Sequence, residues 1–223
     1  MLKRHNTLYP INDIIEQVTA MNFEKRLALN HTSGPLFSGP YSLLPEFKNT
    51  PLGDLIESLG DIGEARLLKL SSGESYIAHA DPDDRLHLAI ITNPYSFVQN
   101  LESQTMYHIP VDGYIWEMDT QFIHVASNFG GRDRIHLNIR ALLPAFTAPG
   151  YRLSIVGGDY DWKHSSYVSF MPYINKAIKQ GLITGIEKVN DRELLLNCNF
   201  DTMEHILTLL VGKDFTVKCE QVN

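Results

Sequence analysis

The chain has 223 residues, with 19 Lys and Arg against 26 Asp and Glu, two Cys, and 43% hydrophobic residues. A chain of this length and composition buries a core without covalent cross-links, which excludes a disulfide-stabilised scaffold. The formal net charge of −7 argues against a general nucleic-acid binder, because phosphate binding needs a surplus of cations on one face. No run approaches the roughly 18 apolar residues of a membrane helix, and the segment MLKRHNTLYP lacks the apolar core of a secretory signal. We therefore expect a cytoplasmic protein that binds neither nucleic acid nor membranes.

The first predicted elements are two helices. Apolar residues recur at helical spacing over residues 11–21, from Ile11 to Met21, and again over residues 52–60, after Pro51. Short strands with turn residues between them follow at residues 65–70, 75–81, 85–92, 114–119, 122–127 and 134–139. This pattern predicts a closed or sandwiched β structure with the two helices packed on one face.

A connector separates these strands from a different kind of sequence. Residues 142–151, LLPAFTAPGY, contain two prolines and a glycine that interrupt any ladder or helix. After the connector we expect strands at 152–156, 182–189, 193–198 and 215–222, and helices at 168–179 and 201–212. The order is β-α-β-β-α-β, which is typical of a ferredoxin-like fold. The sequence therefore predicts two domains, residues 1–147 and a small α+β ferredoxin-like domain over residues 148–223.

The two helices predicted in the second domain each have a distinctive residue near the start. Asp201 is expected to cap the helix at 201–212, because Glu204 follows three residues later and Gly212 ends the pattern. Pro172 falls within the helix predicted at 168–179. It must lie in the first turn of that helix or kink it.

A histidine and an aspartate, His79 and Asp81, end the strand predicted at 75–81. Because alternate residues of a strand face the same way, they can direct two ligands at one point. His124, 43 positions after Asp81 on another predicted strand, can supply a third ligand. Two histidines and one carboxylate bind non-haem iron(II) and leave three coordination positions open. Taken alone the pair is a weak signal, because a surface turn capped by Asp81 before Pro82 is the commoner explanation.

An arginine strengthens the metal interpretation. Arg134 comes ten residues after His124, at the start of the strand predicted at 134–139. A guanidinium there can pair with a carboxylate in bidentate geometry beside the metal. 2-Oxoglutarate chelates iron through its keto-acid end, so its far carboxylate needs a buried cation several ångströms away. The spacing therefore predicts an iron(II) and 2-oxoglutarate site.

Four blocks of the sequence, in order and at compatible spacing, resemble a known family. They are ARLLKLSSGES, HADPDDRLHLAIITNP, DGYIWEMDT and HVASNFGGRDRIHLNI, within residues 60–142. These blocks resemble the aspartyl/asparaginyl β-hydroxylase family of 2-oxoglutarate dioxygenases, and more closely its bacterial branch that contains proline cis-4-hydroxylase. The resemblance implies that the first domain is a mainly β double-stranded β-helix, a cupin-like jelly roll with N-terminal helices and the metal at its mouth.

Carried over position by position, the family pattern assigns the metal ligands and the co-substrate contacts. The implied iron(II) ligands are His79, Asp81 and His124. Arg134 becomes the partner of the distal 2-oxoglutarate carboxylate. Arg85 and His87, from the RLHL block, are expected to contact the co-substrate or a substrate carboxylate.

The carboxylate ligand bears on the substrate. The animal aspartyl hydroxylases have Gly where this chain has Asp81, which favours the branch that acts on small amino acids over EGF-like protein substrates. The leading hypothesis is an iron(II)- and 2-oxoglutarate-dependent dioxygenase that uses O2, with ascorbate as reductant. It would hydroxylate a C–H bond of a free amino acid or a small amino-acid derivative, releasing succinate and CO2. Two alternatives stay open: a hydroxylase of a peptide or protein side chain docked by the second domain, and a non-catalytic jelly-roll protein that senses a ligand.

Several other side chains have two interpretations each. Trp116 fits the core better than substrate stacking, and Asn128 fits a turn beside two glycines better than a substrate contact. Asp119 and Thr120, which precede His124, suit either a tight turn or the orientation of His124 as a metal ligand. His136 suits either the pocket wall or the core. The groups expected to play no part in the site are His108 and His164, as surface residues, and Cys198 and Cys219, as reduced, buried thiols.

Overall fold

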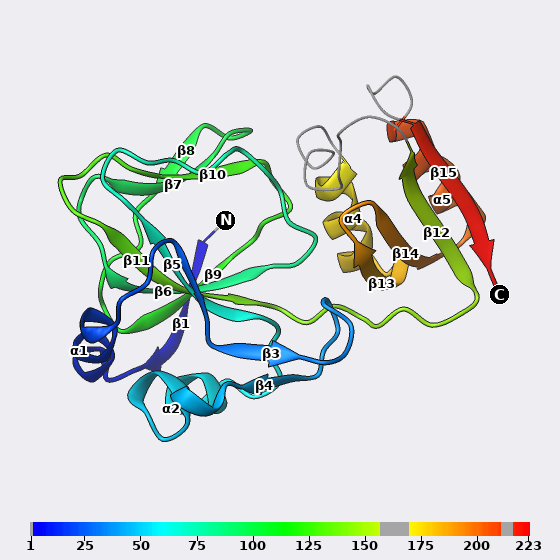
Figure 1. Cartoon of the computed structure of the whole chain (residues 1–223). Coiled ribbons are helices and arrows are strands. Elements are labelled where there is room, and N and C mark those ends of the chain that lie inside the picture. The colour runs from blue at the N-terminus through cyan, green and yellow to red at the C-terminus, as the bar shows by residue number, and fades with distance from the viewer. Residues whose placement is uncertain (1, 157–169, 211–215) are drawn as a thin grey trace.

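The computed structural model describes residues 2–156, 170–210 and 216–223, and much of this chain forms antiparallel β-sheet (Figure 1). The helices are α1 (Ile11–Ala20), α2 (Pro51–Ser58), α4 (Phe170–Lys179) and α5 (Phe200–Leu210), with a short 3-10 helix, η1 (Pro45–Phe47). The strands before the connector are β1 (Leu2–Leu8), β2 (Arg26–Ala28), β3 (Asn30–Thr32), β4 (Tyr41–Leu43), β5 (Ala65–Leu70), β6 (Arg85–Ile91), β7 (Ser96–Asn100), β8 (Thr105–Tyr107), β9 (Tyr114–Met118), β10 (His124–Asn128) and β11 (Arg134–Arg140). The later strands are β12 (Gly150–Val156), β13 (Ile183–Asn190), β14 (Glu193–Cys198) and β15 (Thr216–Val222).

The strands before the connector form two main sheets. The larger sheet has the order β1-β9-β6-β11-β5-β2, and the smaller has the order β10-β7-β8. β11 lies inside the larger sheet, paired with β5 and β6, and is buried along its whole length. Because side chains alternate along a strand, Leu137 faces one side of the sheet while Arg134, His136 and Asn138 face the other. This second face carries the polar groups of the site.

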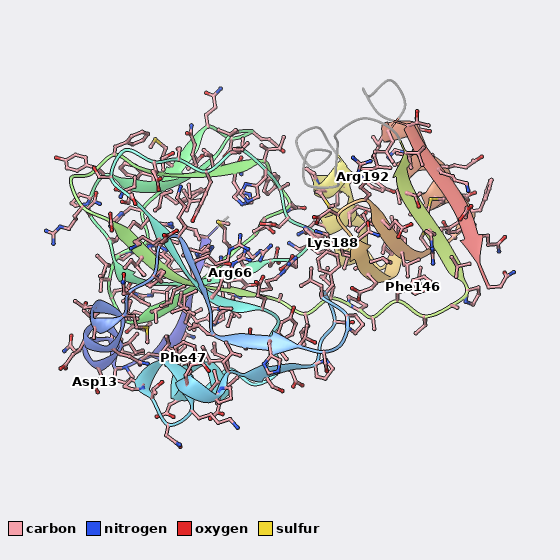
Figure 2. The ribbon with its side chains drawn as sticks, viewed as in Figure 1. Asp13, Phe47, Arg66, Phe146, Lys188 and Arg192 are labelled. Atoms are coloured by element: carbon pink, nitrogen blue, oxygen red, sulfur yellow. The ribbon has the colours of Figure 1, made fainter. Side chains whose placement is uncertain are left out.

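The outer face of the larger sheet packs against α1 and α2, as the sequence predicts. Leu67 of β5 and Leu137 of β11 share a buried cluster with Ile14 of α1 and Leu52 of α2. α1 is amphipathic, since Ile14 is fully buried while Asp13 is exposed and points away from the sheet in Figure 2. Burial of this apolar face, more than helix propensity, stabilises so short a helix.

The inner face of the larger sheet packs against the smaller sheet. A second buried cluster joins Leu70 of β5 and Met118 of β9 to Val98 of β7 and Ala126 of β10. Among the described strands, no ladder closes the two sheets into a barrel. The β-rich, antiparallel class that the sequence predicts is confirmed, in the form of open sheets that face each other.

The strand predicted over residues 75–81 is wrong in detail. This segment makes only two isolated bridges to β10, one from Ser75 to Ser127 and one from His79 to His124. The carbonyl of Ile77 bonds to the His79 ring (2.7 Å) instead of a neighbouring strand, which interrupts the ladder. The predicted strand at 122–127 begins two residues late, at His124. The strands that were not predicted are β1, β2, β3, β4, β7 and β8, most of them short or polar.

The carboxy-terminal elements follow the predicted order, β12-α4-β13-β14-α5-β15, and their strands form a sheet in the order β13-β14-β12-β15. Ile174 of α4 and Ile206 of α5 are fully buried in one hydrophobic cluster with residues of this sheet. Phe37 and Ala80, from the amino-terminal part, belong to the same cluster. Pro172 lies two residues after the first described residue of α4, and the helix continues through Lys179.

The predicted cap of α5 is wrong by two residues. α5 begins at Phe200, and the side-chain oxygen of Asn199 accepts a hydrogen bond from the backbone N–H of Thr202 (2.8 Å). Asn199 is therefore the N-cap, because its side chain reaches the free N–H groups of the first turn. Asp201 lies within that turn, where its charge suits the positive end of the helix dipole. The end predicted at Gly212 lies outside the described residues.

Replacing Thr50 with alanine is expected to destabilise the protein by about 1 kcal/mol. The Thr50 hydroxyl accepts from the Gly53 N–H (3.1 Å) and donates to the Phe47 carbonyl (2.8 Å), so the variant loses the N-cap of α2. Chemical denaturation of both proteins measures the difference. Thr50→Ser keeps the hydroxyl and is expected to stay close to the wild type. Equal losses in the two variants would show that the cap is not the cause.

Candidate metal centre

The three predicted iron ligands lie together. The ligand atoms of His79, Asp81 and His124 are all within 4.8 Å of one another. Asp81 Oδ2 is 3.7 Å from His79 Nε2 and 3.7 Å from His124 Nε2. The backbone holds the two histidines side by side, since each donates its N–H to the carbonyl of the other, at 3.0 and 2.8 Å. The fold thus brings to one point two segments that are far apart in the sequence.

Both imidazole rings have their protons placed for metal binding. His79 Nδ1 is 2.7 Å from the Ile77 carbonyl, and His124 Nδ1 is 2.9 Å from the Phe122 carbonyl. Because a carbonyl oxygen only accepts, each Nδ1 carries a proton, so the lone pair of the neutral ring is on Nε2. In metal sites, a hydrogen bond from the ring nitrogen that does not bind the metal orients the histidine. The two rings therefore fit a cation bound between their Nε2 atoms and Asp81.

The charge state of the ligands also suits a cation. Burial alone would raise the pKa of Asp81, but Arg85 and the two histidines hold that pKa far below its usual range. Arg85 Nη2 donates to Asp81 Oδ1 (2.6 Å), which leaves Oδ2 to face His79 and His124. Burial lowers the pKa of His124, and Asp81 opposes that shift only in part. Asp81 is therefore ionised and the His124 ring neutral near pH 7.

Arg134 is a buried cation that has no counter-ion among the described residues. Its side chain is at the start of β11, where the residue is only 3% exposed. Nη2 donates to His136 Nδ1 (3.0 Å), and no carboxylate pairs with the guanidinium among the described residues. Burial lowers the pKa of Arg134 to about 10, against an opposing effect of Tyr76, so the group stays charged at neutral pH. An unpaired buried charge is costly, and an anionic ligand would compensate it.

A row of unsatisfied hydrogen-bonding groups accompanies Arg134. Because His136 accepts from Arg134 through Nδ1, its proton is on Nε2, which has no partner in the described part of the chain. Asn138 donates to His87 Nε2 (3.2 Å), so the proton of His87 is on Nδ1, also unpartnered there. Burial lowers the pKa of both histidines well below its usual value, and Arg134 adds to the effect. Arg85 contributes two more buried donors, Nε and Nη1. Such a set of donors suits a small molecule with several oxygen acceptors.

Arg85 has a neighbour that sequence reasoning missed. Its Nη2 lies 3.4 Å from Asp83, which is 1% exposed and forms a two-pronged ion pair with Arg140 at 2.7 and 3.1 Å. The acidic run DPDD after His79 is the signal that could have pointed to this network. Arg85 thus contacts a metal ligand directly, besides carrying the unpaired donors that a co-substrate could use.

Asp119 and Thr120 support the metal-ligand segment. Thr120 is fully buried, and its carbonyl accepts from the Asp81 N–H (3.2 Å). Its hydroxyl donates to the Asp83 carbonyl (2.6 Å). Asp119 pairs with Lys179 of α4 (2.9 Å). For Thr120 the structure favours support of a ligand, which is Asp81 and not the expected His124. Asp119 also accepts a hydrogen bond from the Gln121 N–H (3.3 Å), which favours the tight turn for this residue.

The other singled-out residues lie apart from the ligand atoms. Asn128 is fully buried and donates to the carbonyls of Leu70 and Arg132, which favours the turn. Trp116 is half-buried and pairs in register with His87, on the inner face of the sheet. His108 is exposed, as expected. His164 lies outside the described residues. The two thiols are free and half-buried, and burial raises the pKa of Cys198 to about 11.

No protein-family model matches the chain, and no curated protein matches it. Among the described residues, no helix combines the length and the apolar composition needed to cross a membrane.

Proposed function

We propose that the protein is an iron(II)- and 2-oxoglutarate-dependent dioxygenase that hydroxylates a free amino acid or a small amino-acid derivative. One observation carries the proposal. An ionised Asp81 and two histidines with free Nε2 atoms converge in the same sandwich that buries Arg134, a cation with no carboxylate partner in the described part of the chain. A metal ion satisfies the first group and a dicarboxylate the second.

The strand order supports the double-stranded β-helix that the resemblance implies. Counting β5 as the first of eight segments and residues 75–81 as the second, β11 is the eighth. The larger sheet then contains segments one, eight, three and six in that order, and the smaller one contains seven, four and five, with segment two bridged to its edge. This is the arrangement of a jelly roll. The β-α-β-β-α-β order and the sheet order β13-β14-β12-β15 likewise support a ferredoxin-like fold for the carboxy-terminal part.

Iron(II), 2-oxoglutarate and O2 together supply the chemistry, which places one oxygen atom in the substrate C–H bond and the other in succinate, with release of CO2. The protein's part is to bind and orient. His79, Asp81 and His124 would hold the metal on one side and leave three positions open. Arg134, with His136 beside it, would hold the distal carboxylate between the sheets. His87, which is buried, would offer a neutral N–H donor.

Succinate release tests the proposal. Purified protein is supplied with iron(II), ascorbate and 2-oxoglutarate, and is screened against free amino acids and against peptides that contain Asp, Asn or Pro. We expect a free amino acid to stimulate succinate release, and mass spectrometry to detect a product heavier by one oxygen atom. Stimulation by peptides alone would instead favour a protein substrate docked by the carboxy-terminal part. Binding of metal and 2-oxoglutarate without turnover of any substrate would favour a sensor. Absence of metal binding would refute both hydroxylase functions.

A further inference from the structure

We propose that helix α4 positions the metal ligands: Asn175 ties together the two segments that carry them, and Lys179 reinforces the same link. The inference rests on the proposed metal centre and assigns a role to the carboxy-terminal part, which lies beyond the blocks that resemble the hydroxylases. The two segments are residues 79–84, with His79 and Asp81, and residues 119–124, with His124.

Asn175 contacts both ligand segments with one amide group. It is 1% exposed, and its Nδ2 lies 3.2 Å from the Asp81 carbonyl and 3.5 Å from Thr120 Oγ1. Because the Asp81 carbonyl only accepts, the amide nitrogen must face it, so the orientation of this side chain is determined. Its Oδ1 has no partner among the described residues. Within the described ranges, the hydrogen bonds of this buried amide are therefore those to the two ligand segments.

Lys179 makes the same connection one helical turn later. Its Nζ lies 3.0 Å from Asp84 and 2.9 Å from Asp119, so it bridges the same two segments at the surface. Burial lowers the pKa of Lys179, but Asp119 and Asp84 outweigh that effect, and the pKa is raised overall. Residues four apart lie on one face of a helix, so Asn175 and Lys179 present a single contact face to the metal centre.

Apolar packing also holds α4 against the segment that carries His79 and Asp81. Ala80, which lies between the ligands His79 and Asp81, is 3% exposed and belongs to a buried cluster with Met171 and Ile174 of α4. The backbone that carries two of the ligands therefore lies against the helix. None of the α4 contacts reaches a ligand atom, so α4 acts through the positions of the segments.

The metal affinity should depend on how the two ligand segments are held relative to each other. The Asp81 carboxylate belongs to one segment and the His124 imidazole to the other, and they lie 3.7 Å apart. Small shifts of one segment against the other separate the ligands, since metal affinity depends on groups held within about 0.5 Å of the binding geometry. Groups beyond the ligands typically contribute 10–100-fold in metal affinity, and Asn175 is such a group.

Cobalt(II) titration of the full chain tests the inference without relying on turnover. We expect Asn175→Ala to weaken cobalt(II) binding by about tenfold or more. Lys179→Ala is expected to weaken it by about two- to fivefold, as an exposed ion pair allows, while Lys179→Arg keeps the cation and binds like the wild type. Lys176→Ala removes an exposed lysine from the same helix and is the matched control. The visible absorption of bound cobalt(II) reports whether the ligand geometry has changed.

The outcomes separate the two proposals. Thermal melts of the metal-free proteins show whether Asn175→Ala still folds, and if it does not, the Lys179→Ala and Lys179→Arg pair decides. Wild-type cobalt(II) affinity in both Asn175→Ala and Lys179→Ala would overturn the role of α4 but leave the proposed metal centre standing. An equal loss in Lys176→Ala would also overturn it, because the loss would then not depend on the contacts of Lys179 with Asp84 and Asp119. A wild-type chain that binds no cobalt(II) would overturn the metal centre as well.

Discussion

Replacing His124 with alanine is expected to lower iron(II) or cobalt(II) affinity by more than about a hundredfold, beyond what loss of a supporting group costs. The variant should still fold, because the two hydrogen bonds between the backbones of residues 79 and 124 do not need the ring. In the wild type, metal at a hundred times its Kd would stabilise the fold by about 2.7 kcal/mol. Thermal melts with and without metal measure this gain, which should vanish in the variant.

His108→Ala is the matched control for this experiment. His108 is exposed, and its ring contacts the Ser96 carbonyl at 3.0 Å and no metal ligand. We expect this variant to bind metal like the wild type. If His124→Ala also retained wild-type affinity, the assignment of the metal ligands would be wrong.

Replacing Arg134 with methionine is expected to have opposite effects on ligand binding and on stability. Loss of a buried, hydrogen-bonded charge partner costs about 2–5 kcal/mol, so 2-oxoglutarate affinity should fall by at least about thirtyfold. The ligand-free variant should be as stable as the wild type or more so, because methionine removes a buried charge that has no carboxylate partner in the described chain. Calorimetric titration of the metal-loaded protein gives the affinity, and denaturation of the free protein gives the stability.

Arg132→Ala provides the control for charge. It removes the same charge two residues away, from an exposed position. We expect it to leave 2-oxoglutarate affinity almost unchanged. Unaltered affinity in Arg134→Met would refute the role of this residue, and a fall in both variants would point to the overall field of the protein.

The fold could be predicted where burial imposes a clear pattern. β5, β6 and β11 place apolar side chains in the buried core at alternate positions, and this alternation is visible in the sequence. β2, β3, β4 and β8 have three residues each, too few to show a period, and β1 has the polar sequence LKRHNTL. β1 is stabilised by its ladder with β9, a long-range pairing that local sequence does not reveal.

The candidate metal ligands could be predicted from the sequence, but the residues that hold them in place could not. The His-x-Asp spacing is local, whereas His124 is 43 positions further along the chain and is assigned by the order of the blocks that resemble the hydroxylases. The three residues do lie together. The contact of Arg85 with Asp81 follows from a turn whose geometry the sequence did not show. Asn175 lies 94 residues from Asp81, and only the packing of α4 brings them into contact.

The hydrophobic cluster around α4 and α5 also bears on how the chain unfolds. Phe37 and Ala80 are 5% and 3% exposed, and they pack among the carboxy-terminal side chains. The backbone N–H of Ile186 also donates to the Pro144 carbonyl (3.0 Å). The two parts therefore share apolar surface, and we expect them to melt as one cooperative unit. Cleavage in the connector would expose a hydrophobic face on both fragments and leave each prone to aggregation.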